Sequence, residues 1–251
     1  MKYKDFPSDF IKKIEATLKT SRSKSDKIYA AFDADGTLWD TDLGESFFDF
    51  LIDNKKVDLP TDPWNYYLSE KKKDPKKAYL WLAQICKGFD LQTVQDWASE
   101  NVSQLKPPIF NAQADLIKYF KNEGVEVYIV TASIKWAVEP GARLLGLTNE
   151  SVIGVETEIE DGKVTDRQKG PITYRQGKVD AFLKKSNNSY PFFCSGNSEG
   201  DQELLMSAQG IALAVSATRP DDPLYRTERN LLKLAEEKGW LTHRFVDDGQ
   251  L

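Results

Sequence analysis

Two aspartates, Asp33 and Asp35, stand at the end of a short apolar run and are followed by Gly36. On an extended strand end, side chains two residues apart project to the same face, so the two carboxylates are expected to converge. The glycine lets the backbone turn sharply after them. Carboxylates this close repel, which leaves three outcomes: one is protonated, a divalent cation lies between them, or a basic side chain arrives from elsewhere. For an isolated D-x-D-G, a turn in which these carboxylates cap backbone amides is the plainer interpretation.

Magnesium is the cation that suits an oxygen-only set of ligands such as this one. The chain has one histidine, His243, and two cysteines, Cys86 and Cys194, which lie far apart in unlike contexts. These residues cannot form an H-E-x-x-H site, a histidine-rich cage or a thiolate cluster. Zinc chemistry is therefore not expected, and the cysteines are interpreted as ordinary buried thiols.

The segments that must position these aspartates have the pattern of buried parallel strands. Apolar runs at residues 28–32, 125–130, 190–194 and 211–215 each end in small polar residues. Helical patterns lie between several of the runs, and strands that alternate with helices indicate an α/β fold with a parallel sheet. In open sheets of this kind, ligands bind beyond the carboxyl ends of the strands. The sequence has its Asp, Thr, Ser and Asn residues at those ends.

A long segment without strand signals, residues 42–105, separates the first apolar run from the second, and its apolar residues recur with helical spacing. We interpret it as an inserted helical cap, with residues 1–41 and 106–251 forming the core domain. The Lys-Pro-Pro sequence at 106–108 suits a hinge, because two consecutive prolines end a helix and stiffen the link. A hairpin with an Asp-Gly turn is expected over residues 157–166.

Residues 33–38 closely match the first motif of the haloacid dehalogenase superfamily, and three further motifs follow in order. Thr131, which closes an apolar strand, resembles the second motif, and Lys178 resembles the third. Residues 196–201 resemble the fourth. The resemblance spans roughly residues 28–215, and the four motifs together are far more specific than any one of them. The helical insert is similar to the cap of the phosphoserine phosphatase and phosphocholine phosphatase branch.

The resemblance implies a magnesium-dependent phosphomonoesterase with a Rossmann-like core. Asp33 would attack phosphorus and form an aspartyl phosphate, while Asp35 would protonate the leaving alcohol and then activate water. Dehalogenases of the superfamily lack an acid at the second position, so Asp35 favours phosphoester hydrolysis. Lys178 and Mg²⁺ would offset the negative charge of phosphate beside the carboxylates. The other implied contacts are substrate-binding groups at Thr37, Thr131, Ala132 and Ser133 and metal ligands at Asp33, Asp35, Asn197 and Asp201.

Asn197 departs from the commonest form of the fourth motif, which has an aspartate at this place. An amide oxygen can still coordinate a cation, but it contributes no charge. Either Asp201 moves into direct contact with the metal, or the metal binds more weakly. The sequence leaves open whether Asn197 or Asp201 is the direct ligand, whereas Asp35 would contribute its backbone carbonyl.

Two acidic residues just beyond the first motif, Asp42 and Glu45, have two interpretations. They suit a helix start with its capping partner. They also suit an amine or a quaternary ammonium on the substrate, as in phosphoserine or phosphocholine, because phosphoserine phosphatases are similar in carrying an acid here. Most nearby aromatic residues are expected in the core, with one or two left to cage a ligand. The candidates for the cage are Trp39, Trp64, Tyr66, Tyr67 and Trp81.

Residues 196–200 also spell G-x-S-x-G, the nucleophile elbow of serine hydrolases, with Ser198 as the candidate nucleophile. Asp221 or Asp222 and then His243 follow in the right order. Against this alternative, only 53 residues follow Ser198 and no Gly-rich oxyanion segment is visible. A phosphate-binding module without turnover is a third alternative, and it is disfavoured because the carboxylates and the lysine are intact.

The 251 residues carry 34 basic and 39 acidic side chains, which gives a net charge of −5. This balance gives no reason to expect nucleic acid or an anionic membrane as a partner, and a small-molecule phosphate ester is expected instead. The chain has no run of 18 apolar residues, and its charged beginning is unlike the apolar core of a signal peptide. We therefore expect a soluble cytoplasmic protein; a leader cleaved upstream and the oligomeric state stay open.

Overall fold

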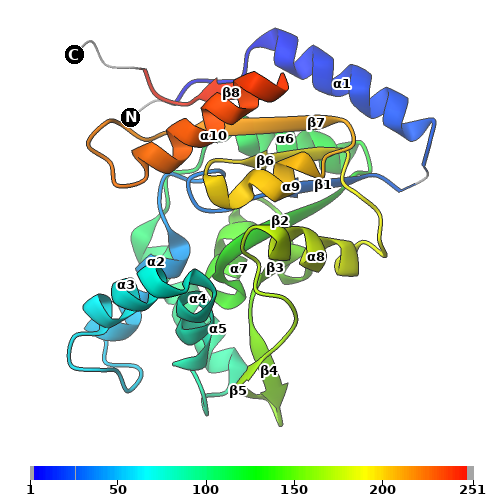
Figure 1. Ribbon diagram of the computed structural model, residues 1–251. Coiled ribbons are helices and arrows are strands. Elements are labelled where there is room, and N and C mark those ends of the chain that lie inside the picture. Colours follow the sequence, from blue (N-terminus) through cyan, green and yellow to red (C-terminus); the bar gives the residue numbers. More distant parts are fainter. Residues whose placement is uncertain (1–2, 26, 248–251) are drawn as a thin grey trace.

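Six parallel strands form the central sheet of the computed structural model, which describes residues 3–25 and 27–247. The strand order is β3-β2-β1-β6-β7-β8, and every neighbouring pair is parallel (Figure 1). The sheet confirms the predicted α/β class; the outermost residues of the predicted core, 1–2 and 248–251, lie outside the described residues. The strands are β1 (Tyr29–Phe32), β2 (Glu126–Ile134), β3 (Val152–Val155), β6 (Phe193–Gly196), β7 (Ile211–Ser216) and β8 (Leu241–Arg244).

Helices cover both faces of the sheet because successive side chains of each buried strand point to opposite sides. In β1, Phe32 belongs to an apolar cluster with α1 and α6, whereas its neighbour Ala31 belongs to a second cluster with α8, α9 and α10. Both faces of the sheet are therefore buried, as the continuous apolar runs indicate. These helices are α1 (Ser8–Arg22), α6 (Asn111–Asn122), α8 (Gln176–Lys185), α9 (Gln202–Met206) and α10 (Tyr225–Lys238).

Two strand boundaries differ from the sequence-based expectation. Strand β2 continues through residues 131–133 to Ile134, so the expected polar end of the strand is itself extended. Strand β6 begins at Phe193 instead of residue 190, because Pro191 has no N–H to donate to a neighbouring strand and Tyr190 is 50% exposed. The strand then runs on to Gly196, which brings the fourth-motif residues directly to its end.

Four helices lie between β1 and α6, and they gather below the sheet in Figure 1. Their apolar side chains, among them Phe47, Leu82 and Val94, form one buried cluster. This arrangement agrees with the helical periodicity of residues 42–105, whose division into a separate cap stays a prediction. The helices are α2 (Leu43–Asp53), α3 (Pro63–Lys73), α4 (Pro75–Gln84) and α5 (Leu91–Leu105).

The predicted hairpin forms and packs on these helices. It consists of β4 (Thr157–Glu160) and β5 (Lys163–Gln168), which pair antiparallel. The amide of Gly88 donates to the carbonyl of Val164 at 2.8 Å, and the amide of Val164 donates to the carbonyl of Phe89 at 2.9 Å. Val164 also joins the apolar cluster of the four helices, so the hairpin is part of the same packing unit.

None of the helices in the described ranges is both long and apolar enough to span a bilayer.

Candidate active site

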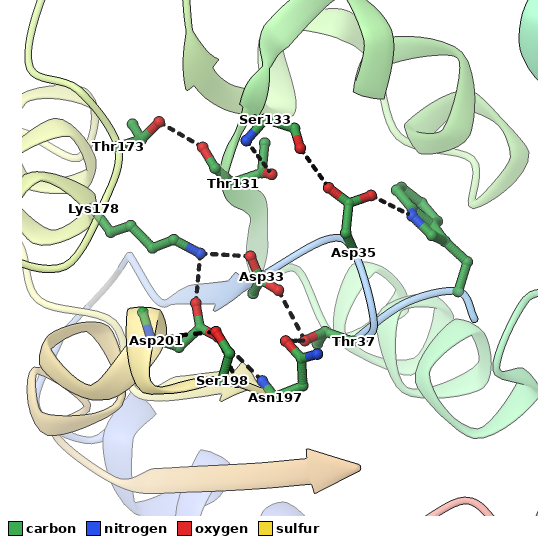
Figure 2. Close-up of polar contacts among 12 residues, drawn as sticks. Asp33, Asp35, Thr37, Thr131, Ser133, Thr173, Lys178, Asn197, Ser198 and Asp201 are labelled. Carbon is green, nitrogen blue, oxygen red and sulfur yellow. Dashed lines mark hydrogen bonds and ion pairs between the residues drawn. The ribbon is translucent and has the colours of Figure 1, made fainter. Parts of the chain in front are cut away.

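Asp33 follows the last residue of β1, and its backbone amide donates to the carbonyl of Ser195 in the neighbouring strand β6 at 2.9 Å. The side chain is 9% exposed. One carboxylate oxygen accepts from the Lys178 ammonium at 2.5 Å, and the other accepts from the Thr37 hydroxyl at 3.0 Å (Figure 2). Gly36, with φ of +73°, turns the chain so that Thr37 faces back toward Asp33. The first motif thus folds into a tight loop around one buried carboxylate.

Lys178 bridges two carboxylates, those of Asp33 and Asp201, at 2.5 Å each. All three side chains are buried. Burial disfavours the ammonium ion, but Asp201 and Asp33 outweigh it and raise the pKa of Lys178. Burial and the charge of Asp201 raise the pKa of Asp33 to about 7 despite this lysine. The repulsion between acidic groups is therefore relieved by a basic side chain that arrives from another element, α8.

Asp201 is held by the loop that follows β6. One of its oxygens accepts from the amides of Asn197 and Ser198 at 3.2 and 3.0 Å and from the Ser198 hydroxyl at 3.1 Å. This capping box begins a short 3₁₀ helix, Glu199–Asp201. The other oxygen binds Lys178. Both oxygens thus have protein partners, and Asp201 orients the lysine.

The Ser198 hydroxyl donates to Asp201, whereas His243 lies on edge strand β8. The His243 ring packs against Phe6 and Phe245, with ring centroids 4.8 and 5.0 Å away, and its Nε2 lies 3.2 Å from the carbonyl oxygen of Lys4. Burial lowers the pKa of His243. The serine and the histidine therefore have separate partners, and the arrangement does not support a serine hydrolase triad.

Asp35 lies in the turn beyond the end of β1. The hydrogen-bond partners of its carboxylate differ from those of the Asp33 carboxylate. It accepts from Trp39 Nε1 at 2.9 Å, from the Leu43 amide at 2.8 Å and from the Ser133 hydroxyl at 2.6 Å. Strand β1 ends at Phe32, so the two carboxylates do not project from a regular strand as expected, but both line the same cavity. Burial raises the pKa of Asp35, although these three donors lower it.

The second motif forms the wall opposite the fourth. Thr131, Ala132 and Ser133 all line the cavity that contains Asp33 and Asp35. The Thr131 hydroxyl accepts from the Ser133 amide at 3.0 Å, and its backbone carbonyl accepts from the Thr173 hydroxyl at 2.5 Å. Thr173 was not predicted, because it precedes the third motif in a segment without periodicity.

Asn197 lies at the end of β6, 3% exposed, with its amide between two partners. The amide nitrogen donates to Glu228 at 2.8 Å, and the amide oxygen accepts from the Thr37 hydroxyl at 3.2 Å. Glu228 belongs to α10 and is 1% exposed. No sequence signal pointed to Glu228, because no motif contains it and 31 residues separate it from Asn197.

The cavity has a volume of about 290 Å³ and extends from the strand ends to the helical insert. Asp42 caps α2 by accepting from the Glu45 amide at 2.7 Å, so the predicted helix start is confirmed, and both residues also line the cavity. Burial, together with the charges of Asp35 and Glu45, raises the pKa of Asp42 well above its usual value. Asp42 and Glu45 therefore make the helical side of the cavity acidic.

A lysine of the protein itself occupies the place expected for a caged cation. The Lys71 ammonium lies 2.7 Å from Glu45 and 5.2 and 5.6 Å from the ring centres of Tyr67 and Tyr79. Of the five aromatic residues proposed for the cage, only Tyr67 lines the cavity, together with the unpredicted Tyr79 and Tyr174. The others pack elsewhere: Trp39 donates to Asp35, and Trp64, Tyr66 and Trp81 pack within the helical insert.

The oxygen atoms near Asp33 suit a hard divalent cation. Within residues 3–25 and 27–247, no group of three His, Cys, Asp or Glu side chains forms a metal cage. The candidate set is mixed: the Asp33 carboxylate, the Asn197 amide oxygen, which the Glu228 contact turns toward Thr37, and the backbone carbonyl of Asp35. Asp201 lies close by but has both oxygens engaged.

Comparison with known proteins places the chain in a family. Residues 30–206 match the haloacid dehalogenase-like hydrolase family. A probable phosphatase of Mycobacterium tuberculosis is 31% identical over 163 residues, which cover 63% of this chain and 52% of that protein. A phosphorylcholine phosphatase of Pseudomonas aeruginosa is 22% identical over 216 residues, which cover 70% of this chain and 61% of that protein. The chain spans about half to three fifths of the length of these relatives.

A solved phosphoserine phosphatase, in the form of an analogue of its phospho-aspartyl intermediate, has the same fold. Its TM-score is 0.53 at 16% sequence identity, with 88% of this chain and 95% of that chain covered. Because the family match covers more than half of the sequence, the protein belongs to the haloacid dehalogenase-like hydrolases. The predicted superfamily and its Rossmann-like fold are thereby confirmed.

Proposed function

We propose that this hydrolase is a magnesium-dependent phosphomonoesterase that cleaves a small phosphate ester through an aspartyl phosphate on Asp33. The observation that carries the proposal is the buried Asp33 carboxylate, which Lys178 and Thr37 hold at 2.5 and 3.0 Å beside the cavity that Asp35 also lines. A nucleophile, an acid and a cation thus surround one space. The two relatives named as phosphatases support the same reaction class.

The reaction follows from these positions. The Asp33 carboxylate attacks phosphorus, and the ester oxygen leaves with a proton from Asp35, whose burial favours the protonated form. Asp35 then takes a proton from water, which attacks phosphorus and releases Asp33. Lys178 and the Thr37 hydroxyl stabilise negative charge on the phosphoryl oxygens, and the Thr131 to Ser133 segment forms the opposite wall.

Asp33, the Asn197 amide oxygen and the Asp35 backbone carbonyl are the groups that would hold Mg²⁺. Bound there, the cation offsets the charge of the phosphate beside the carboxylates. In this assignment Asp201 is the partner of Lys178 and not a direct ligand, because its two oxygens accept four hydrogen bonds, whereas the Asn197 oxygen accepts one, from Thr37. We thus choose Asn197 where the sequence left the choice open.

Helices α2 to α5 and the β4-β5 hairpin are proposed to act as a cap that closes over the substrate and excludes water. Asp42 is the acidic group best suited to a substrate ammonium, because Lys71 already neutralises Glu45. The phosphorylcholine phosphatase and phosphoserine phosphatase among the similar proteins support an amine-bearing substrate. A screen of phosphoserine, phosphocholine and sugar phosphates tests this preference.

Two variants separate the proposed function from its alternatives. Asp33→Asn should abolish hydrolysis of p-nitrophenyl phosphate with the fold intact, whereas Ser198→Ala should retain most of it. EDTA should remove the activity and Mg²⁺ should restore it. The reverse pattern of variants would favour a serine hydrolase, and binding of phosphate esters without hydrolysis would favour a binding module.

A further inference from the structure

Glu228 has no place in the proposed reaction, yet its buried carboxylate contacts Asn197, the residue that departs from the common fourth motif. We propose that Glu228 is a positioning residue that fixes the Asn197 amide with its oxygen toward the cation, so that the pair replaces a single aspartate. The inference rests on the proposed metal-dependent function. It concerns a residue outside every motif, on helix α10.

The Glu228 carboxylate accepts hydrogen bonds from four donors. One oxygen accepts from the amides of Ala217 and Thr218, both at 3.2 Å, and from the Thr218 hydroxyl at 2.7 Å. The other oxygen accepts from the Asn197 amide nitrogen at 2.8 Å. Four donors, two of them backbone amides, thus hold the Glu228 carboxylate in one orientation.

This anchored carboxylate selects the orientation of the Asn197 amide. The nitrogen must face Glu228, because an amide oxygen there would be placed against a carboxylate oxygen. The Asn197 oxygen therefore faces the Thr37 hydroxyl, which also contacts Asp33. Gly36 packs directly against the Asn197–Glu228 contact, since a Cβ at this position would lie 2.1 Å from the Asn197 nitrogen and 3.5 Å from a Glu228 oxygen. The loop that carries Asp33 thus packs against Asn197 and Glu228 and holds their orientation.

An aspartate at position 197 would not fit this surrounding. Its second oxygen would take the place of the nitrogen, 2.8 Å from Glu228, and two buried carboxylates in contact repel each other strongly. The neutral amide of Asn197 avoids that repulsion. The acidic side chain, Glu228, then lies behind Asn197 and not in direct contact with the cation. Such supporting contacts orient metal ligands, and their loss typically weakens metal binding by roughly 10- to 100-fold.

Three variants of the full chain test the pairing. In Glu228→Gln, the side-chain oxygen must accept the hydrogen bonds from Ala217 and Thr218. The introduced amide nitrogen then faces the Asn197 nitrogen, and the Asn197 amide must rotate by about half a turn to place its oxygen there. In Asn197→Asp, two carboxylates meet. In the double variant, the introduced amide nitrogen donates to the introduced carboxylate, and the contact is complementary again.

The readout is Mg²⁺ affinity after EDTA treatment, measured by isothermal titration calorimetry, with circular dichroism to verify folding. Each single variant should bind Mg²⁺ about tenfold or more weakly than wild type. The double variant should recover most of the loss, which a purely structural role of Glu228 would not produce. Glu139→Gln is the matched control: Glu139, in helix α7 (Lys135–Leu144), is buried at 2% exposure, accepts from Gln95 at 2.8 Å and does not line the cavity, so the affinity should not change.

Equal or tighter binding by Asn197→Asp would overturn the inference, as would a double variant no better than the weaker single variant. Should Glu228→Gln not fold, Asn197→Asp alone decides between the two results. Unchanged Mg²⁺ affinity in both single variants, beside Mg²⁺-dependent hydrolysis by wild type, would overturn the pairing and leave the proposed function standing. Absence of both Mg²⁺ binding and hydrolysis in wild type would overturn the proposed function itself.

Discussion

The two sides of the cavity are built differently. On the sheet side, the side chains of Asp33, Lys178 and Asp201 are 9%, 2% and 1% exposed, and they form ion pairs with one another. On the helical side, the side chains of Lys71 and Glu45 remain 33% and 31% exposed. The sheet side has charged groups that cannot move without leaving a buried charge unpaired, whereas the helical side has groups that can exchange partners. We infer that the first side is built for one reaction and the second for selection of a substrate.

Next to Asp33→Asn, which removes the nucleophile, the largest loss of rate with the sheet side intact should come from Asp35→Asn. The new amide keeps the contacts with Trp39, Leu43 and Ser133 but cannot supply a proton. We expect kcat to fall by about 10²- to 10⁴-fold. The fall should be greater for an alkyl phosphate than for p-nitrophenyl phosphate, whose leaving group needs less protonation. Equal losses for both esters would argue against Asp35 as the acid.

Removal of the bridging ammonium should break the sheet side altogether. Lys178→Met leaves the buried carboxylates of Asp33 and Asp201 without a cation, so the free energy of unfolding should fall by about 3–5 kcal/mol and hydrolysis should be lost. Urea unfolding monitored by circular dichroism measures the change. The double variant Lys178→Met with Asp201→Asn should regain stability but not activity. A loss of only about 0–1 kcal/mol, as for a surface ion pair, would contradict this description.

The difference between the sheet side and the helical side also explains which site residues could be predicted from the sequence. Asp33 and Asn197 directly follow buried strands, and Thr131 lies in the last part of β2. All three line one cavity because the ends of parallel strands meet at one edge of the sheet. Contacts set by packing between distant elements had no local signal. Examples are Glu228 beside Asn197, Lys71 over Tyr79, and the hairpin on the helical insert. Their partners are fixed only when the helices dock.

A smaller effect is expected on the helical side. Lys71→Met keeps an unbranched side chain over Tyr67 and Tyr79 but removes the ammonium, which frees Glu45. Relative to an ester without an ammonium group, kcat/KM for a substrate that has one should rise by up to about tenfold, because the cavity regains an acidic and aromatic surface. Steady-state kinetics with phosphocholine and p-nitrophenyl phosphate measure the ratio. The exposed neighbour Lys72→Met is the control, and an unchanged ratio in Lys71→Met would count against this role.

The smallest effect concerns His243, outside both sides of the cavity. Burial holds its pKa below the ordinary value near 6.5, so the unfolded chain binds a proton more readily than the folded one. Its contribution to stability is therefore constant at higher pH and turns unfavourable as the pH falls below about 6.5. His243→Gln should make the unfolding free energy less dependent on pH between about 7.5 and 5.5. An unchanged pH dependence would show that other groups set it.

The most direct test of the central claim is to trap the phosphorylated enzyme. Wild-type protein is mixed with p-nitrophenyl phosphate and Mg²⁺, quenched in acid within the first turnover, digested and analysed by mass spectrometry. We expect one hydroxylamine-sensitive phosphoryl group on Asp33 of the wild-type protein, and none in the Asp33→Asn variant. Phosphorylation of Ser198 instead, or steady hydrolysis with no label on Asp33 at any quench time, would contradict it.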